Sequence, residues 1–552
     1  MPRRPATSLR IGRTVRGVRA SLSAPWRAVS ARLGPRPTRL VIVPPELRTL
    51  DPAIAEDVMA GHYALGGKVV SLSEGSPFAV VDAPPTWSRA LYSLFWLRHL
   101  TTLDSPGARD HARAILAGFI AMRTWPPVAQ DTRLVARRLI SLIAAAPYLL
   151  DGADAAFYKS FLRCLARHGR RLQRALVAEH DPLARLQAGV ALLHLALSID
   201  RSERLARRAI AATGSELNAQ IAADGSHIGR NPETAVMLLF DLIPLRQCFV
   251  RRGVEPPQPI LNAIDRMLAM VRHMRHADGA LAAFNGAGGA PRDLLAALIA
   301  YGDAASPASP GLRGGYARLV AADAVALIDA APAGPIAATA QAHAGCLSFE
   351  FSTEGKRWIV NCGSPRDDGA ELAEALRTTI AHSTATLGNA TSSLFIESAT
   401  ATYLLGPPDA SAALSEDGMS FDGRHDGYEK RFGMRHERSI ALSPDGGGLS
   451  GRDSFPGEPP DHVPAALRFH LHPAIEPRLS DDDTFVLLIA RDGEAWRFSA
   501  DDAPLEIEES IYLGDGAPRR TMQIVIRLSL SERRHVAWLL ERVSRGRGRG
   551  DG

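Results

Sequence analysis

The spacing of hydrophobic residues changes once along this chain, near residue 305, and that change limits the folds it can adopt. Upstream, hydrophobic residues recur every three or four positions, the period of one helix face. In "DPLARLQAGVALLHLALSI" the residues on this face are Leu183, Leu186, Val190, Leu193 and Leu197. Comparable stretches cover 88–103, 106–122, 131–149, 154–177, 203–221, 232–252 and 258–275. Because short loops with Gly, Pro or Asp separate these stretches, we expect sequential antiparallel helices in a toroid or bundle.

Downstream of the connector "DAASPASPGLRGG", hydrophobic residues occupy every second position instead. "CLSFEFS" alternates Leu347, Phe349 and Phe351, and "TFVLLIARDGEAWRFSA" is two strand-like runs around an Asp-Gly turn. Alternation of this kind, broken by turn residues, is typical of antiparallel strands. A region of this size predicts a large antiparallel β-domain of stacked sheets.

The length of 552 residues is too great for one hydrophobic core, so the chain should form at least two large domains. We predict an α+β multidomain protein, with an N-terminal α/α toroid followed by a C-terminal antiparallel β-sandwich. The predicted parts are a basic flexible tail (1–40), the helical toroid (41–305), the β-sandwich (306–543) and a disordered tail (544–552).

Positive charge is concentrated at the start of the chain, where residues 1–40 hold ten arginines and no acidic residue. A solvated tail, a targeting segment and a membrane-surface helix all fit this composition. No secretory signal is visible, and the longest apolar run, "AGVALLHLALSI", is too short for a transmembrane segment. The basic excess lies mostly in the tails and lacks interleaved aromatic residues, which argues against nucleic-acid binding.

The stretch "AADGSHIGRNPETAVMLL" gathers polar residues where a helix begins. The Asp-Gly pair makes a turn, Asn231 caps the helix and Pro232 fits its first position. His227 and Arg230 remain unexplained, next to a helix N-terminus that attracts anions. The stretch is therefore either a helix cap or a carboxylate-binding site.

Three segments, "DGSHIGRNP", "HAGCLSFEFSTEGKRWIVNCG" and "RTTIAHST", resemble motifs of the heparinase II/III family of polysaccharide lyases. The family patterns are approximately D-G-G-H-x-E-R-S-P, H-x-H-x-D-x-x-S-F followed by D-x-G, and R-x-T-x-A-H-N-T. The likeness in organisation covers roughly residues 80–550. It implies a toroid joined to a β-sandwich, and a carbon–oxygen lyase that cleaves a heparin-like, heparan-like or alginate-like polysaccharide by β-elimination at a uronic acid. It also implies a periplasmic or cell-envelope location, with the cytoplasm as the alternative because no signal peptide is visible.

β-Elimination needs a group that neutralises the uronate, a base for C5 and an acid for the leaving oxygen. The resemblance assigns His227 and Arg230 to the carboxylate as catalytic residues. It places Asn231, Asn285 and Gln341 among the substrate-binding residues, and it requires no cofactor.

The chain departs from the family pattern at several of these places. "ADGALAAFNG", where the family's catalytic tyrosine is expected, has no tyrosine, and Gln341 replaces the catalytic histidine. His343, Asn361 and His382 stand where some members hold a metal. Because an Asn amide is a weak ligand beside Asp, we expect zinc to bind weakly or not at all.

These departures leave more than one function open. The first is a lyase acting on an acidic polysaccharide. The alternative is a catalytically impaired relative that binds acidic glycan or assists polysaccharide biosynthesis. Glycoside hydrolysis would need two carboxylates across a cleft, and no such pair stands out in the sequence.

Overall fold

The computed structural model describes residues 37–73, 75–80, 82–290, 292–301, 308–365, 370–398, 401–406, 409–458 and 462–544. Most of the predicted N-terminal tail (1–40) and C-terminal tail (544–552) therefore lies outside the described residues. No helix in the described part of the chain has the length and hydrophobicity needed to cross a bilayer.

The chain divides into two compact units, which are described separately. The first unit comprises residues 1–220 and 238–264, and the second comprises 221–237 and 265–552. The sequence predicted a single boundary at residue 305 between the helical and the β-sandwich domains, and this division differs from that boundary. A buried ion pair and a buried hydrogen bond explain the difference, because Arg230 pairs with Asp329 and His276 contacts Glu350, which tie helical-region residues to the strands.

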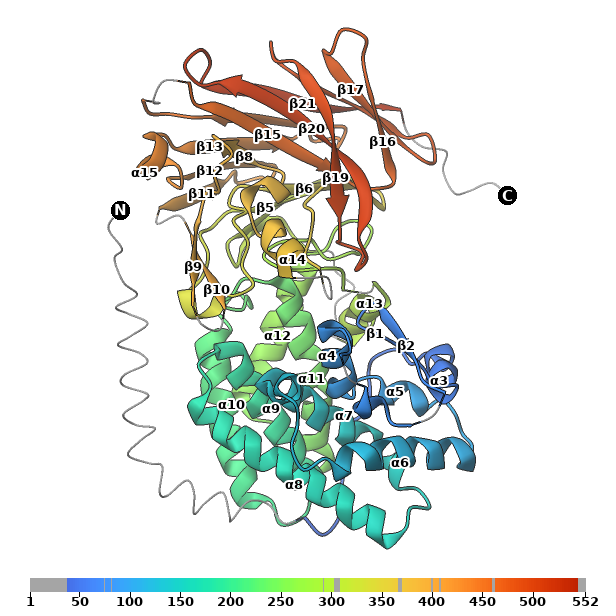
Figure 1. The fold of residues 1–552 in the computed structure, drawn as a ribbon. Coiled ribbons are helices and arrows are strands. Elements are labelled where there is room, and N and C mark those ends of the chain that lie inside the picture. The colour runs from blue at the N-terminus through green and yellow to red at the C-terminus, as the bar shows by residue number, and fades with distance from the viewer. Residues whose placement is uncertain are drawn as a thin grey trace. The chain divides into compact units, whose positions relative to one another are not determined.

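The first unit is mainly helical (Figure 1). It contains α3 (Pro52–Met59), α4 (Pro85–Ser93), α5 (Leu97–Leu100), α6 (Pro106–Ala121), α7 (Thr132–Leu150), α8 (Ala155–Ala178), α9 (Pro182–Ser198), α10 (Glu203–Gln220) and the hairpin β1 (His62–Leu65) and β2 (Lys68–Ser71). The carboxylates of Asp131, Asp154 and Asp181 accept backbone N–H bonds at the starts of α7, α8 and α9. These caps satisfy donors that a helix N-terminus leaves unpaired. Helix α9 packs against α7, α8 and α10 and is buried except at Gln187, which makes it the centre of this unit.

Two helices belong to both units, because α11 (Pro232–Arg251) and α12 (Gln258–His273) cross from one to the other along the chain. The remaining helices, α13 (Arg292–Tyr301), α14 (Ala370–Leu376) and α15 (Glu429–Phe432), lie in the second unit.

The second unit is built on two large sheets. One sheet has the order β19-β20-β15-β7-β6-β5-β4-β3, and β8 also pairs with β15. Its strands are β3 (Gly311–Arg313), β4 (Tyr316–Ala321), β5 (Ala324–Asp329), β6 (Phe349–Thr353), β7 (Lys356–Val360), β8 (Ala385–Leu387), β15 (Pro464–Leu471), β19 (Leu505–Tyr512) and β20 (Arg519–Ser529).

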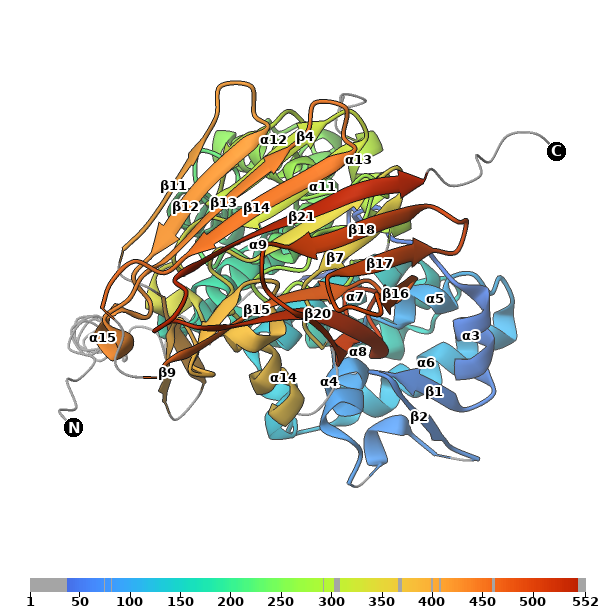
Figure 2. The ribbon, with the colours of Figure 1, turned by 90° about the horizontal axis from the view of Figure 1, so that it is seen from above.

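The other sheet has the order β11-β12-β13-β14-β21-β18-β17-β16, and its strands can be followed across Figure 2. They are β11 (Ala410–Leu414), β12 (Ser420–His425), β13 (His436–Leu442), β14 (Gly448–Ser454), β16 (Ile475–Leu479), β17 (Phe485–Ala490), β18 (Ala495–Ala500) and β21 (His535–Ser544). A separate hairpin consists of β9 (Leu394–Glu397) and β10 (Thr402–Leu405).

Aromatic side chains join the two sheets face to face. Phe349 of β6 stacks on Trp538 of β21 with ring centroids 5.4 Å apart, and Phe469 of β15 meets the same indole edge-on at 5.1 Å. The alternating residues Leu347, Phe349 and Phe351 are all buried, as the period-2 pattern requires. Every strand pairing in the described residues is antiparallel, which confirms the predicted order of helices followed by antiparallel sheets.

Candidate functional site

The polar stretch before α11 folds as a turn followed by a capped helix. The Asp224 carboxylate accepts the Ser226 N–H at 2.9 Å, and the Asn231 side-chain oxygen accepts the Glu233 N–H at 2.8 Å. Asn231 thus caps the first turn of α11, as the turn-and-cap reading expects. His227 is buried, and its Nδ1 accepts the Gly229 N–H at 3.0 Å.

Arg230 uses all of its side-chain donors within the protein. A guanidinium has five N–H groups. One donates to Asp329 Oδ1 at 2.5 Å, and the others donate to the carbonyls of Gly314, Gly315, Ala331 and Pro332 at 2.7–3.2 Å. Burial opposes the charge, but Asp329 outweighs it and raises the pKa of Arg230 above its ordinary value. This arrangement leaves Arg230 no donor for a substrate carboxylate, which argues against its predicted role.

Asn285 belongs to the same buried network. Its amide nitrogen donates to the Tyr316 hydroxyl at 2.7 Å and to Asp329 Oδ2 at 3.1 Å, while its oxygen accepts the His343 N–H at 3.2 Å. The Tyr316 hydroxyl donates in turn to the Arg230 carbonyl at 2.5 Å. Burial raises the pKa of Tyr316, so its hydroxyl stays protonated and structural. Asn285 and Tyr316 therefore hold the backbone around the site and are not among the residues that line the adjacent cavity.

A cavity of about 610 Å³ opens beside this network, entirely within the second unit. Three residues predicted from two separate motifs, Asn231 from one and Gln341 and His343 from the other, come together in its wall. Arg377 lines the same cavity, and so do two carboxylates, Glu233 and Glu374, but no tyrosine does. His227, Arg230 and Asn285 are not among the lining residues. We call this space the Arg377 cavity; its size lies within the range of small-ligand pockets.

Arg377, which follows α14 directly, was missed by the sequence reasoning. Its Nε donates to the Ala342 carbonyl at 3.0 Å, and its two terminal nitrogens donate to the carbonyls of Thr402 and Thr339 at 2.9 and 3.2 Å. None of the ion pairs among the described residues involves it, and two of its five N–H groups remain available. Burial lowers the pKa of this guanidinium, an effect that nearby Glu374 partly offsets. A fixed guanidinium without a carboxylate partner can receive an anionic group.

The predicted metal positions bring together two histidines and an amide but no carboxylate. Asn361 turns its amide oxygen to the Ser383 N–H at 2.9 Å and its amide nitrogen to Glu350 at 3.3 Å. The side-chain nitrogens of His343 and His382 lie 3.2 Å apart and contact each other directly. No cluster of three His, Cys, Asp or Glu residues suited to a metal occurs among the described residues. Two imidazoles and an engaged amide make a weak zinc site, so weak or absent zinc binding stays a prediction.

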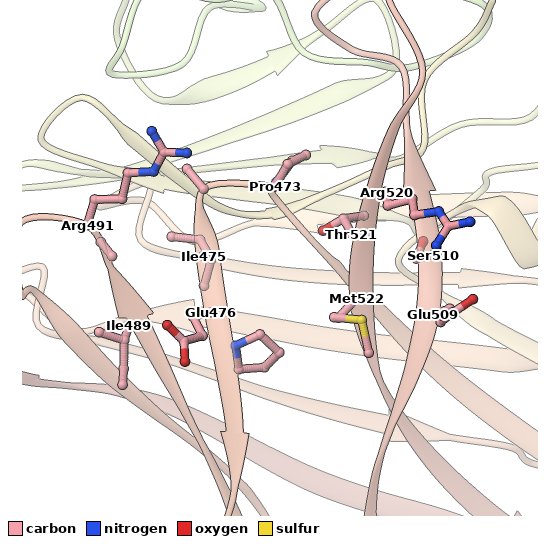
Figure 3. A pocket seen from close by; sticks show the side chains of 13 residues that line it. Pro473, Ile475, Glu476, Ile489, Arg491, Glu509, Ser510, Arg520, Thr521 and Met522 are labelled. Atoms are coloured by element: carbon pink, nitrogen blue, oxygen red, sulfur yellow. The ribbon is translucent and has the colours of Figure 1, made fainter.

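A second cavity of about 470 Å³ lies where the sheet-edge strands β16 and β19 approach each other (Figure 3). Ile475, Ile489 and Met522 line it with apolar surface, while Arg491 and Arg520 add charge. None of the predicted site residues lines this cavity. The candidate site is therefore the Arg377 cavity.

Comparisons with known proteins agree with the sequence resemblance. Residues 303–539 match the family described as "Heparinase II/III-like, C-terminal". The FtsZ-localized protein C of Caulobacter vibrioides (strain NA1000 / CB15N) is 29% identical over 514 residues, which cover 89% of this chain and 88% of that protein.

Among solved structures, heparinase III matches with a TM-score of 0.72 at 14% identity, covering 90% of this chain and 85% of that one. A heparan sulfate lyase mutant from Pedobacter heparinus matches with a TM-score of 0.62 at 14% identity, covering 97% and 90%. At such identities the likeness concerns the fold alone. The predicted fold class, a toroid followed by an antiparallel β-sandwich, is confirmed.

Proposed function

The chain has the heparinase II/III-type fold, and on that premise we propose that it binds an acidic saccharide in the Arg377 cavity without efficient turnover. The observation that carries the proposal is the buried Arg377 guanidinium, which lines the cavity and has no carboxylate partner among the residues that the structure describes. A carboxylate is planar and can accept two parallel hydrogen bonds from such a group.

The rest of the cavity wall suits a lightly charged saccharide. Asn231 and Gln341 contribute amides, and Glu233 and Glu374 contribute carboxylates that accept hydrogen bonds from hydroxyls. The two glutamates also repel densely sulfated chains. We therefore propose a non-sulfated, uronate-type saccharide as the ligand class.

Efficient elimination is disfavoured by the groups that the cavity lacks. No tyrosine lines it to act as the acid, Gln341 replaces the family's catalytic histidine, and Arg230 is occupied by Asp329. β-Elimination nevertheless remains the second candidate, because His343 presents an imidazole to the cavity and an imidazole is a common general base.

Calorimetry with an alginate tetrasaccharide, a heparan sulfate tetrasaccharide and neutral cellotetraose tests the proposal. We expect the alginate probe to bind best and Arg377→Met to weaken it about ten- to hundredfold, the scale for losing hydrogen bonds to a charged group. Arg377→Lys keeps the charge, and its affinity should fall between those of the wild type and Arg377→Met. The matched control is Arg318→Met, because Arg318 is also a buried guanidinium held by backbone carbonyls but does not line the cavity.

The same samples should be followed for the absorbance of unsaturated uronate. Equal affinity for cellotetraose and alginate, or an equal loss of affinity in Arg377→Met and Arg318→Met, would contradict the binding proposal. Steady release of unsaturated product that stops in His343→Gln would establish the lyase instead.

The relative in Caulobacter supports a further proposal on location. Because the two chains align over nearly their whole lengths, we propose that this protein also localises with FtsZ. A fluorescent fusion should then form a midcell band that disappears when FtsZ is depleted. A uniform signal, or a band that persists without FtsZ, would contradict this proposal.

A further inference from the structure

Helix α8 of the first unit carries positive charge that no acidic residue of the helix balances. It is the longest helix in the described part of the chain (Figure 1), and residues 155–178 hold one lysine, five arginines and no acidic residue. Lys159 and Arg163 are exposed, and neither pairs with a carboxylate of the described residues. The Arg163 guanidinium donates only within its own helix, to the Ser160 hydroxyl at 2.9 Å and to the Lys159 carbonyl at 3.3 Å. This side of α8 therefore attracts anions.

A groove of about 860 Å³ runs along the same side of α8. Ala155, Tyr158, Leu162 and Ala166 line it, and we call these four residues the apolar floor. Because they are three or four positions apart, they follow one side of the helix over about 16 Å. Lys159 and Arg163 line the groove as well. The α8 groove thus combines apolar and cationic surface.

The other part of the groove wall is a short segment that hydrogen bonds hold in place. Pro37 and Thr38 line the groove. The Thr38 N–H donates to the Asp200 carboxylate at 2.8 Å, and the Leu40 N–H donates to the Tyr158 hydroxyl at 3.4 Å. These bonds fix the segment against α8 before any ligand arrives, which lowers the entropy cost of binding.

The chemistry of the α8 groove distinguishes between possible occupants. Residues 1–36, which lead into Pro37, hold nine arginines and no acidic residue, so α8 repels them. A saccharide needs partners for many hydroxyls, whereas the apolar floor offers only the Tyr158 hydroxyl. A bilayer surface is flat and cannot fill a recessed groove. A helix with one apolar and one acidic side meets both kinds of surface, as in other helix-in-groove complexes.

We propose that the α8 groove binds an acidic amphipathic helix of a partner protein. The apolar side chains of that helix pack on the apolar floor, and its carboxylates pair with Lys159 and Arg163. Carboxylates four residues apart on the partner match the spacing of these two cations. The groove lies in the first unit and shares no residue with the Arg377 cavity, so this inference does not rest on the proposed function.

Fluorescence anisotropy with the full chain tests the proposal. The probe is a fluorescein-labelled peptide of about 18 residues, with leucine at every third or fourth position and glutamate on the opposite side. We expect saturable binding that Lys159→Glu with Arg163→Glu weakens about ten- to thirtyfold, because two attractions become repulsions. Ala155→Trp fills the groove without changing its charge and should also weaken binding. The matched control is Arg204→Glu with Arg208→Glu, which reverses two exposed arginines four positions apart on α10, outside the groove, and should leave the affinity unchanged.

The other possible occupants give different results. A peptide with lysine in place of every glutamate should not bind. Failure of the acidic peptide to bind, an equal loss of affinity in both double variants, or displacement of the peptide by the alginate tetrasaccharide would overturn the proposal.

Three further results would assign the α8 groove to another occupant and overturn the proposal in the same way. The first is binding to phosphatidylglycerol vesicles in place of the peptide, lost in Lys159→Glu with Arg163→Glu. The second is a crosslink from a photoreactive benzoylphenylalanine at position 155 to residues 1–36 of the same chain. The third is a dimer, seen by sedimentation, that Lys159→Glu with Arg163→Glu dissociates.

Discussion

Replacing Arg230 with methionine should destabilise the second unit severely, because Arg230 is the counter-ion of a buried carboxylate. The side chains of Arg230 and Asp329 are 9% and 3% exposed, so solvent cannot replace the lost partner. Removing one member of a buried pair costs about 3–5 kcal/mol. The Gly314, Ala331 and Pro332 carbonyls also lose a donor. We expect a total loss of about 4–6 kcal/mol, a large part of the roughly 5–15 kcal/mol that stabilises a typical domain.

A second substitution tests whether the buried charge is the cause. Arg230→Met with Asp329→Asn removes both charges, so the double variant should be more stable than Arg230→Met alone. The deficit of Arg230→Met should also be smaller at about pH 5 than at about pH 8. Burial already raises the pKa of Asp329, and loss of the guanidinium raises it further, so acid neutralises the unpaired carboxylate.

Hydrogen exchange read on peptides from β4 and β5 reports this loss in the second unit, where global unfolding of a two-unit chain would mix two transitions. Arg230→Lys, which keeps the charge and loses most of the carbonyl contacts, supplies a folded variant for calorimetry with the alginate tetrasaccharide. We expect its affinity to match that of the wild type. An Arg230→Lys protein that keeps native exchange rates but loses saccharide affinity would refute this reasoning and restore the carboxylate-binding role.

Three further outcomes are expected. Burial alone would raise the pKa of Asp453, but Arg438 outweighs burial and holds that pKa at about 2. The stability that this carboxylate contributes is therefore present above about pH 4 and is lost toward pH 2. Asp453→Asn should flatten the fall in stability at acid pH. Gly345→Ala should cost about 1–3 kcal/mol in thermal unfolding, because its Cβ would lie 2.7 Å from Cδ2 of His382 and displace that ring. Elemental analysis after dialysis should find far less than one zinc per chain; stoichiometric zinc that disappears in His343→Ala would contradict this.

The sequence predicted those features whose signals are local. The period of the hydrophobic residues indicates the helices and strands, and Asn231 and Pro232 indicate the start of α11. The role of Arg230 could not be read in this way. Its partner Asp329 lies 99 residues away, in a strand whose register depends on the completed sheet. A basic residue that capping does not explain looks the same in sequence whether it meets a ligand or a distant carboxylate.

The Arg377 cavity was predicted only in part for the same reason. Asn231 was singled out from one motif and Gln341 and His343 from another, and the meeting of the two motifs in one wall depends on tertiary structure. Arg377 stands first in "RTTIAHST", yet sequence cannot show that backbone carbonyls satisfy only three of its N–H groups. The sign that separates Arg377 from Arg230 is the absence of a carboxylate partner among the described residues, and this is visible only after folding.

The departures from the family motifs are physically consistent with one another. Gly345, in place of an aspartate, leaves the space that the His382 ring fills, since any Cβ there would collide with it. Asn361, in place of another aspartate, is neutral and both of its amide atoms are engaged by Glu350 and Ser383. Without those two carboxylates a metal would have few ligands, and the two imidazoles satisfy each other instead. The cavity wall keeps the guanidinium of Arg377, together with the amides of Asn231 and Gln341 and the carboxylates of Glu233 and Glu374.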